Sequence, residues 1–339
     1  MKYTLYPLYG LADQIDDQPF DLSTLPLQIT DSVRLEPVAD RFRPGAFDLW
    51  KKMIGENAFE KTERIRFALV HRYDSSAVNP QKAEEKSKEI VNQLAACLRL
   101  IRPMRESVLS VHGDIRDDDG LFEVGGFDLF PGGHVEVPEV QRLFHLRHKD
   151  VEDLVRLAPL FLEAMEGEIW KFRMAVQFHE LGHFQSVAWK GRFLLWCSAI
   201  ESIYTTVHRE HQGSRVAKAR IKWFLGANTN IYQNGDLSSL LTDPQINVAD
   251  VLDDLYEMRN FIAHGDKLPD LYFQEQMRTG FNGPVKKVEV LLEAASSIIR
   301  MSLKKILRDN LVPNFAGAVE AQAFFAAQRL TKSDLQRVN

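Results

Sequence analysis

The stretch "NVADVLDDLYEMRNFIAHG" (residues 247–265) decides how the second half of the chain folds. Its apolar residues recur at spacings of three and four, which aligns them along one side of an α-helix. They are Val248, Val251, Leu255, Met258 and Ile262. Acidic residues gather near the start, where the helix dipole is positive, and Gly265 supplies the left-handed residue with which helices commonly end. The stretch therefore predicts an amphipathic helix over 247–264.

The rest of the second half shows the same helical spacing. Further helices are predicted at 151–166 with a bend at Pro159, at 168–184, 192–209 and 214–225, and from Pro284 onward. Because helices of this length joined by short loops pack against one another, residues 147–311 are expected to form an all-α antiparallel helical bundle. Residues 312–339 are expected to form a partly helical tail, whose Phe324 and Phe325 need a surface to cover.

The first 140 residues mix strand and helix patterns. Runs with the β-branched and aromatic content of strands lie at 2–10, 28–38, 64–74 and 106–115. Residues 79–103 have an Asn-Pro start, apolar residues at helical spacing and a proline stop, which predicts one long helix. The stretch "FPGGHVEVP" (130–138) then marks the end of this part. Residues 1–140 are therefore expected to form an α+β domain of unknown role.

Composition narrows the class of protein. The chain has 339 residues, of which 45% are hydrophobic, so it can bury a large core or two ordinary ones. A net charge of −5 excludes wholesale coating of nucleic acid, so any phosphate contact must be local. Cys97 and Cys197 have no CxxC partner, which is typical of buried thiols in a reducing compartment. No signal-peptide core and no membrane-spanning stretch is visible, and we expect a cytoplasmic protein without membrane contact.

The end of the 247–264 helix carries three polar residues that suit phosphate chemistry. Asn260 and His264 are four apart and share a face, and the long side chain of Arg259 can swing to that side. RNA cleavage by its own 2′-hydroxyl needs a base, an acid and positive donors for the phosphate, and no metal. Histidine titrates near neutral pH, and arginine offers a planar donor set. In the structural alternative, His264 caps the helix and Arg259 pairs with a neighbouring carboxylate.

In this setting, "RNFIAHG" (259–265) resembles the Arg-polar-x-x-x-His signature of HEPN domains. Upstream, "GRFLLWCSAIESIYTT" (191–206) resembles the long helix of that family, with its acidic residue at Glu201. "SRVAKARIKWFL" (214–225) resembles the following short helix of the Apea-like branch. The resemblance covers about residues 147–310 and does not extend to the first domain.

This resemblance implies a metal-independent endoribonuclease without cofactors, a homodimer whose motif helices face each other across one cleft, and a defence or toxin role. It implies that Arg259 stabilises phosphate charge, that Asn260 fills the polar position and that His264 is base or acid. Glu201 would orient or neutralise Arg259. Many members of the family bind without cutting, so a non-catalytic RNA- or protein-binding module is an alternative.

Two helix faces are consistent with this site. Glu201 shares a helical face with Cys197, Ser198, Thr205 and His208, although an exposed helix glutamate is an equal interpretation. On the 214–225 helix, Arg215, Lys218 and Lys222 share one face, with Arg220 nearby. This face would hold an RNA backbone, although a basic run is more often a solvated face.

"HELGH" (179–183) predicts a competing chemistry. In the H-E-x-x-H pattern, His179 and His183 would bind zinc and Glu180 would activate water. A catalytic zinc needs a third protein ligand. Glu201 on the next helix is a candidate, but its surroundings do not resemble those of zinc peptidases. The two histidines also continue an apolar stripe and would serve equally in packing, so a zinc-dependent hydrolase remains the alternative function.

Overall fold

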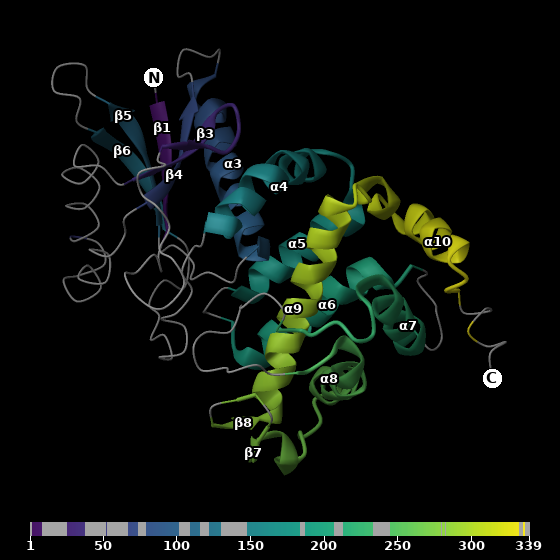
Figure 1. Cartoon of the computed structure of the whole chain (residues 1–339). Coiled ribbons are helices and arrows are strands. Elements are labelled where there is room, and N and C mark those ends of the chain that lie inside the picture. Colours follow the sequence, from purple (N-terminus) through teal and green to yellow (C-terminus); the bar gives the residue numbers. More distant parts are fainter. Residues whose placement is uncertain are drawn as a thin grey trace. The chain divides into compact units, whose positions relative to one another are not determined.

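The computed structural model describes residues 2–8, 26–37, 52, 67–73, 79–101, 109–115, 122–129, 148–183, 187–206, 213–232, 245–278, 280–281, 283–331 and 335. The chain divides into two compact units (Figure 1): unit 1 is Met1–Glu163 and unit 2 is Ala164–Asn339. The division falls within helix α4 (His148–Glu166), which contains Pro159. The predicted boundary between residues 140 and 147 lies outside the described residues.

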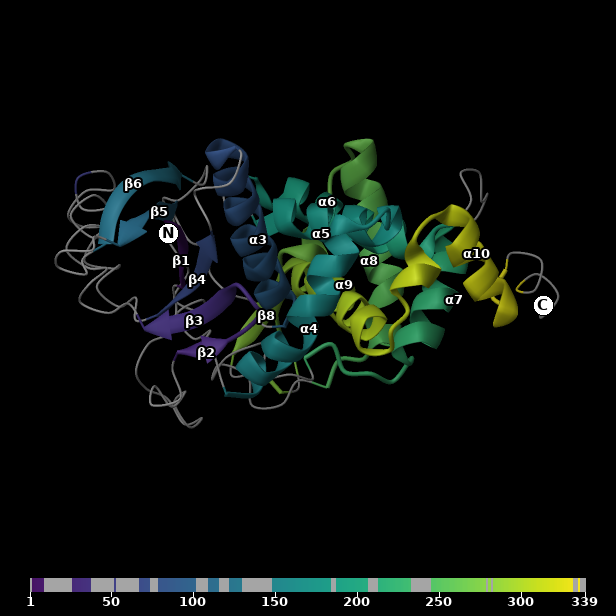
Figure 2. The same ribbon diagram turned by 90° about the horizontal axis from the view of Figure 1, so that it is seen from above.

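Unit 1 contains a six-stranded antiparallel sheet with the strand order β2-β3-β4-β1-β5-β6. The strands are β1 (Lys2–Leu8), β2 (Leu27–Gln28), β3 (Val33–Pro37), β4 (Phe67–Tyr73), β5 (Leu109–Ile115) and β6 (Phe122–Leu129). Helix α3 (Pro80–Ile101) packs against β1 and β4 (Figure 1, Figure 2). The sheet and its helix agree with the predicted α+β character.

Two features of the sheet differ from the sequence expectation. The run 28–38 is not one strand, because the backbone turns after Thr30, whose hydroxyl accepts a hydrogen bond from Val33 N at 3.2 Å. Strand β6 was not predicted. Its Gly125 has no partner in the ladder, since His112 pairs with Gly126 and Gly113 pairs with Val124. Such a bulge interrupts the alternation from which strands are predicted.

A buried polar cluster joins the sheet to α3. His71 Nδ1 on β4 lies 2.7 Å from Ser87 Oγ on α3, and Ser87 Oγ lies 2.6 Å from Thr4 Oγ1 on β1. All three side chains are buried. Burial lowers the pKa of His71 from 6.5 to about 4. The fold therefore holds this imidazole neutral at pH values at which an exposed histidine is charged.

This lowered pKa predicts that unit 1 loses stability in mild acid. Between pH 6.5 and 4 the unfolded chain binds a proton at His71 that the folded chain does not, so the free energy of unfolding falls with pH. The loss reaches at most ~3 kcal/mol and is complete near pH 4. Urea unfolding of the wild type and of His71→Gln at pH 7 and pH 4.5 measures it. The glutamine variant cannot titrate, and an equal pH dependence in both proteins would contradict the assignment.

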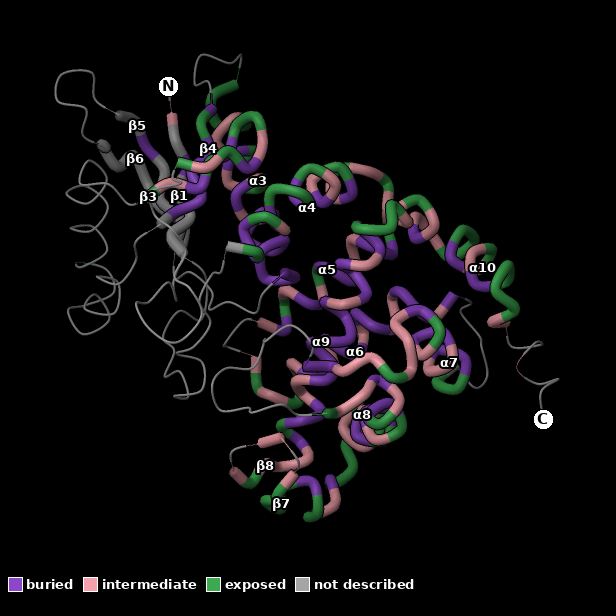
Figure 3. The backbone as a smooth tube through the Cα atoms, viewed as in Figure 1, coloured by how far each residue is buried: buried purple, intermediate pink, exposed green. Residues whose placement is uncertain are grey.

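Unit 2 is mostly helical. Its main helices are α5 (Trp170–His183), α6 (Trp189–Tyr204), α7 (Gly213–Leu225), α8 (Val248–His264) and α9 (Lys287–Arg308). Helix α9 contacts α5, α6, α7 and α8 and is buried along most of its length (Figure 3). The helical character predicted for the second half of the chain is confirmed, and α9 forms the middle of its core.

Helix α8 forms where its spacing predicts. Val248, Val251, Leu255 and Met258 are buried, and Ile262 is half-buried. The Asp250 carboxylate accepts a hydrogen bond from the backbone N–H of Asn247 at 3.0 Å, which satisfies a donor at the helix start. The helix ends at Gly265, whose φ of 76° lies in the left-handed region. Local sequence alone therefore sets both ends of this helix.

Two other helix ends differ from the prediction. Helix α6 ends at Tyr204 rather than at 209, because Lys171 Nζ donates to the carbonyl oxygens of Ser202 and Thr205, at 2.7 and 2.6 Å. Thr205 is extended, so it does not continue the helical face of Glu201. Pro284 does not start α9, since it begins the short strand β8 (Pro284–Lys286), which pairs with β7 (Glu275–Met277).

The residues after α9 belong to unit 2. They form the 3-10 turn η4 (Val312–Phe315) and helix α10 (Ala318–Ala327). Phe325 is fully buried, and its ring contacts Tyr204, Trp223 and Phe315. The surface that the sequence required for the tail phenylalanines is thus supplied by α6, α7 and η4. Among the described residues, no helix combines the length and the apolar character needed to cross a membrane.

Candidate functional site

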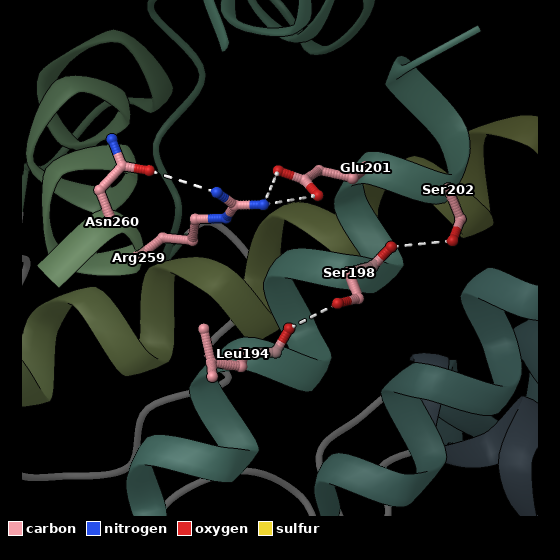
Figure 4. A network of polar contacts seen from close by, with 6 residues as sticks. All are labelled: Leu194, Ser198, Glu201, Ser202, Arg259 and Asn260. Carbon is pink, nitrogen blue, oxygen red and sulfur yellow. Dashed lines mark hydrogen bonds and ion pairs between the residues drawn. The ribbon is translucent and has the colours of Figure 1, made fainter. Parts of the chain in front are cut away.

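An ion pair joins α8 to α6 at the C-terminal part of both helices. Arg259 Nη2 lies 3.2 Å from Glu201 Oε1 and 3.3 Å from Glu201 Oε2. Arg259 Nη1 donates to Asn260 Oδ1 at 3.3 Å, so the guanidinium lies between the carboxylate and the amide (Figure 4). The side chains of Arg259 and Glu201 remain 33% and 32% exposed. The pair is therefore ordered by its partners and still accessible to a ligand.

The neighbouring apolar residues explain why these polar groups lie at an edge. On α6, Ile200 and Ile203 are buried on either side of Glu201. On α8, Met258 is fully buried directly before Arg259, while Asn260 is exposed directly after it. The polar positions thus lie where each helix turns from the core to solvent.

His264 lies one helical turn beyond Asn260. It is the last residue of α8 and is exposed. Within the described part of the chain, no hydrogen bond or ion pair joins His264 to Arg259 or Glu201. The structure therefore brings Arg259, Asn260 and Glu201 together and leaves the imidazole of His264 open to solvent beside them.

Two buried side chains lie next to the ion pair. Cys197 is 4% exposed and Tyr256 is 6% exposed. Burial raises the pKa of both groups, the negative charge of Glu201 raises each further, and Arg259 opposes that rise. Both are held neutral, so Cys197 is a structural thiol rather than a nucleophile. Tyr256 was not among the residues that the sequence singled out, although it lies only three positions before Arg259.

The basic face of α7 is partly neutralised by α8. Lys218 Nζ lies 2.5 Å from Asp253 Oδ1. This hydrogen bond, together with the charges of Lys218 and Lys222, lowers the pKa of Asp253. Arg215 is exposed. Arg220, expected near this face, is instead fully buried and donates to the Tyr204 carbonyl at 2.7 Å.

The competing histidine pair is largely internal. His179 is fully buried, and its Nε2 lies 3.1 Å from Nε2 of His183. The indole of Trp196 donates to the carbonyl of His179 at 3.2 Å, and Glu180 Oε1 lies 3.4 Å from His179 Nδ1. Among the described residues, no group of three or more His, Cys, Asp or Glu side chains is arranged to hold a metal ion. Glu201, the candidate third ligand, pairs with Arg259 instead.

Some predicted features fall outside this description. His208, expected on the face of Glu201, lies outside the described residues.

The hydroxyls of Ser198 and Ser202 donate to carbonyl oxygens one turn back in α6, at 2.9 and 2.8 Å (Figure 4). The hydroxyls of these serines therefore donate within their own helix. Of the polar face predicted on α6, Glu201 is the residue that contacts α8 through an ion pair.

Protein-family models, curated proteins and solved structures give no match to this chain. The resemblance to HEPN domains therefore rests on the residues of α6, α7 and α8 themselves.

Proposed function

We propose that this chain is a metal-independent endoribonuclease of HEPN type, which cuts RNA by attack of the 2′-hydroxyl on the adjacent phosphorus. The observation that carries the proposal is the accessible Arg259–Glu201 pair at the end of α8, with exposed His264 one turn beyond Asn260. The same proposal places the protein in the cytoplasm and gives it a role as a defence or toxin effector. The effector role is what the family resemblance suggests.

Arg259 would bind the scissile phosphate. A guanidinium presents several N–H donors in one plane, and Glu201 and Asn260 restrict it to one side of α8. Donors that are already oriented stabilise the charge that develops on the phosphate oxygens during attack. A bound phosphate would share the guanidinium with Glu201, which lies against its Nη2 group.

His264 would move the protons. One imidazole accepts the proton of the 2′-hydroxyl as the bond from O2′ to phosphorus forms. The 5′-oxygen takes up a proton as its bond to phosphorus breaks, which leaves a 2′,3′-cyclic phosphate and a 5′-hydroxyl. One chain offers a single histidine at this position, so two simultaneous proton transfers favour a second copy that brings a second imidazole. This requirement supports the proposed homodimer.

The basic face of α7 would hold the RNA backbone. Arg215 is exposed, and Lys218 and Lys222 are half-buried beside α8. The chain has a net charge of −5, so RNA contact must depend on such a local group of cations. Lys218 already pairs with Asp253, so a phosphate would have to compete with that carboxylate for it.

An RNA oligomer with one 2′-deoxy nucleotide tests the reaction. The purified chain is expected to cut the all-ribose oligomer at mapped bonds and to spare only the bond that follows the deoxy position. Products are resolved by gel and their ends identified by mass spectrometry. Cutting at the deoxy position would overturn 2′-hydroxyl attack. Binding of both oligomers without any cutting would instead support the non-catalytic alternative.

A further inference from the structure

Tyr256 presents a buried polar atom that has no hydrogen-bond partner in the part of the chain that the structure describes. Its ring is on α8, its side chain is 6% exposed, and its hydroxyl makes no hydrogen bond to any described residue. A buried hydroxyl without a hydrogen bond lowers the stability of the state in which it is found. By contrast, the buried hydroxyls of Tyr204 and Tyr272 bond to Ser302 and Glu257, at 2.7 and 2.8 Å.

The position of Tyr256 on α8 points to Glu201 as the acceptor for this hydroxyl. Tyr256 and Arg259 are three residues apart on α8 and share a face of the helix. Helix α6 packs against α8, and its Glu201 carboxylate is held by Arg259. After burial, the negative charge of Glu201 is the largest cause of the raised pKa of Tyr256. The Tyr256 phenol is therefore an unused donor on the helix face that also carries Arg259, the residue that holds Glu201.

Phosphate binding at Arg259 would take hydrogen bonds away from Glu201. Arg259 shares its Nη2 group between both oxygens of Glu201. A phosphodiester that binds Arg259 competes for the same donors, because phosphate and carboxylate both match the guanidinium. The half-buried carboxylate then loses hydrogen bonds, and an ionised group in that position requires replacements.

We propose that Tyr256 is a positioning residue that donates a hydrogen bond to Glu201 when a phosphodiester draws Arg259 away from that carboxylate. The inference rests on the proposed function. The hydroxyl would keep the Glu201 side chain in place, so that Arg259 stays aligned on the phosphate during the reaction. Tyr256 itself touches neither the substrate nor a reacting atom.

Tyr256→Phe removes the oxygen alone. We expect the free protein to unfold at the same or a higher temperature, because a buried hydroxyl without a partner is lost. We expect kcat for RNA cleavage to fall about tenfold or more, as for loss of a hydrogen bond to a charged group. The matched control Tyr272→Phe removes a hydroxyl that bonds to Glu257, and it should lower the unfolding temperature without lowering kcat.

A double-mutant cycle ties the effect to Glu201. In a Glu201→Ala background, Tyr256→Phe should change kcat by less than about twofold, because its acceptor is gone. A wild-type rate in Tyr256→Phe would overturn the inference and leave the proposed function intact. A lowered unfolding temperature with a proportionate loss of rate would show a structural role and would also overturn it. A wild-type chain that neither binds nor cuts RNA overturns both proposals.

Discussion

His264→Ala is expected to slow RNA cleavage by about 10²-fold or more while the unfolding temperature stays unchanged. The imidazole is exposed at the last position of α8 and, within the described part of the chain, makes no hydrogen bond or ion pair with Arg259 or Glu201. Its loss therefore removes proton transfer without removing packing. Most point substitutions lower stability, but those at exposed positions usually change it little. This one separates the two effects, because the helix is ended by Gly265 rather than by His264.

The measurement pairs single-turnover cleavage with thermal unfolding. Lys267→Ala is the matched control, since Lys267 is exposed three residues further on and pairs only at the surface with Asp270, at 3.2 Å. It should keep the wild-type rate. A His264→Ala protein that cuts RNA at the wild-type rate would remove the proton-transfer role. Retained RNA binding without cutting in the same variant is the expected result.

Arg220→Met is expected to lower the free energy of unfolding of unit 2 by about 3 kcal/mol or more. Arg220 is fully buried and holds three parts of the chain together. It donates to the carbonyls of Tyr204 and Leu330, at 2.7 and 3.1 Å, and to Gln322 at 3.4 Å. Its guanidinium also lies 4.8 Å from the centre of the Phe325 ring. Methionine fills the volume but takes the guanidinium donors away from these acceptors, of which only Gln322 keeps another hydrogen bond among the described residues, from the hydroxyl of Thr206.

The loss of stability should first appear in helix α10. Helix α10 depends on Arg220 and on the ring contacts of Phe325, so limited proteolysis should release it at a lower temperature in the variant. Arg215→Met is the matched control, because Arg215 is on the same helix and exposed, where a charge contributes little to stability. Equal unfolding temperatures for the two variants would refute the anchoring role of Arg220.

The sequence predicts those parts of the fold that local spacing controls. The start and end of α8 follow from Asp250, the apolar stripe and Gly265, which all act within one helix. The end of α6 depends on Lys171, which is 31 and 34 residues away from the carbonyls that it binds. No helical periodicity carries that information. Strand β6 is missed for a related reason, since its register depends on a bulge opposite β5.

In the candidate site, too, spacing predicts the residues of one helix but not their contacts with distant parts of the chain. Arg259, Asn260 and His264 are recognisable because they lie within one turn and a half of a single helix. The partnership of Arg259 with Glu201, 58 residues earlier, came from the family resemblance and not from spacing. Tyr256 was overlooked because an aromatic residue beside an apolar stripe looks like core. Arg220 was grouped with the basic face because spacing alone does not show which cations are buried.

Glu201 separates the two chemistries that the sequence leaves open. The zinc-dependent hydrolase would use it as a third ligand with His179 and His183, and the ribonuclease would use it to hold Arg259. In the structure its carboxylate oxygens lie 3.2 and 3.3 Å from the guanidinium. Among the described residues, no group of three or more His, Cys, Asp or Glu side chains is arranged to hold a metal ion, so Glu201 is not grouped with the two histidines. The structure therefore favours the arginine partnership over metal ligation for this residue.

Cleavage of RNA in the presence of excess chelator tests the central claim most directly. The wild-type chain, stripped of metal, should cut RNA at an undiminished rate and leave 2′,3′-cyclic phosphate ends, while Arg259→Ala and His264→Ala should not. No cleavage until zinc is restored, or equal cleavage by all three proteins, would contradict the account.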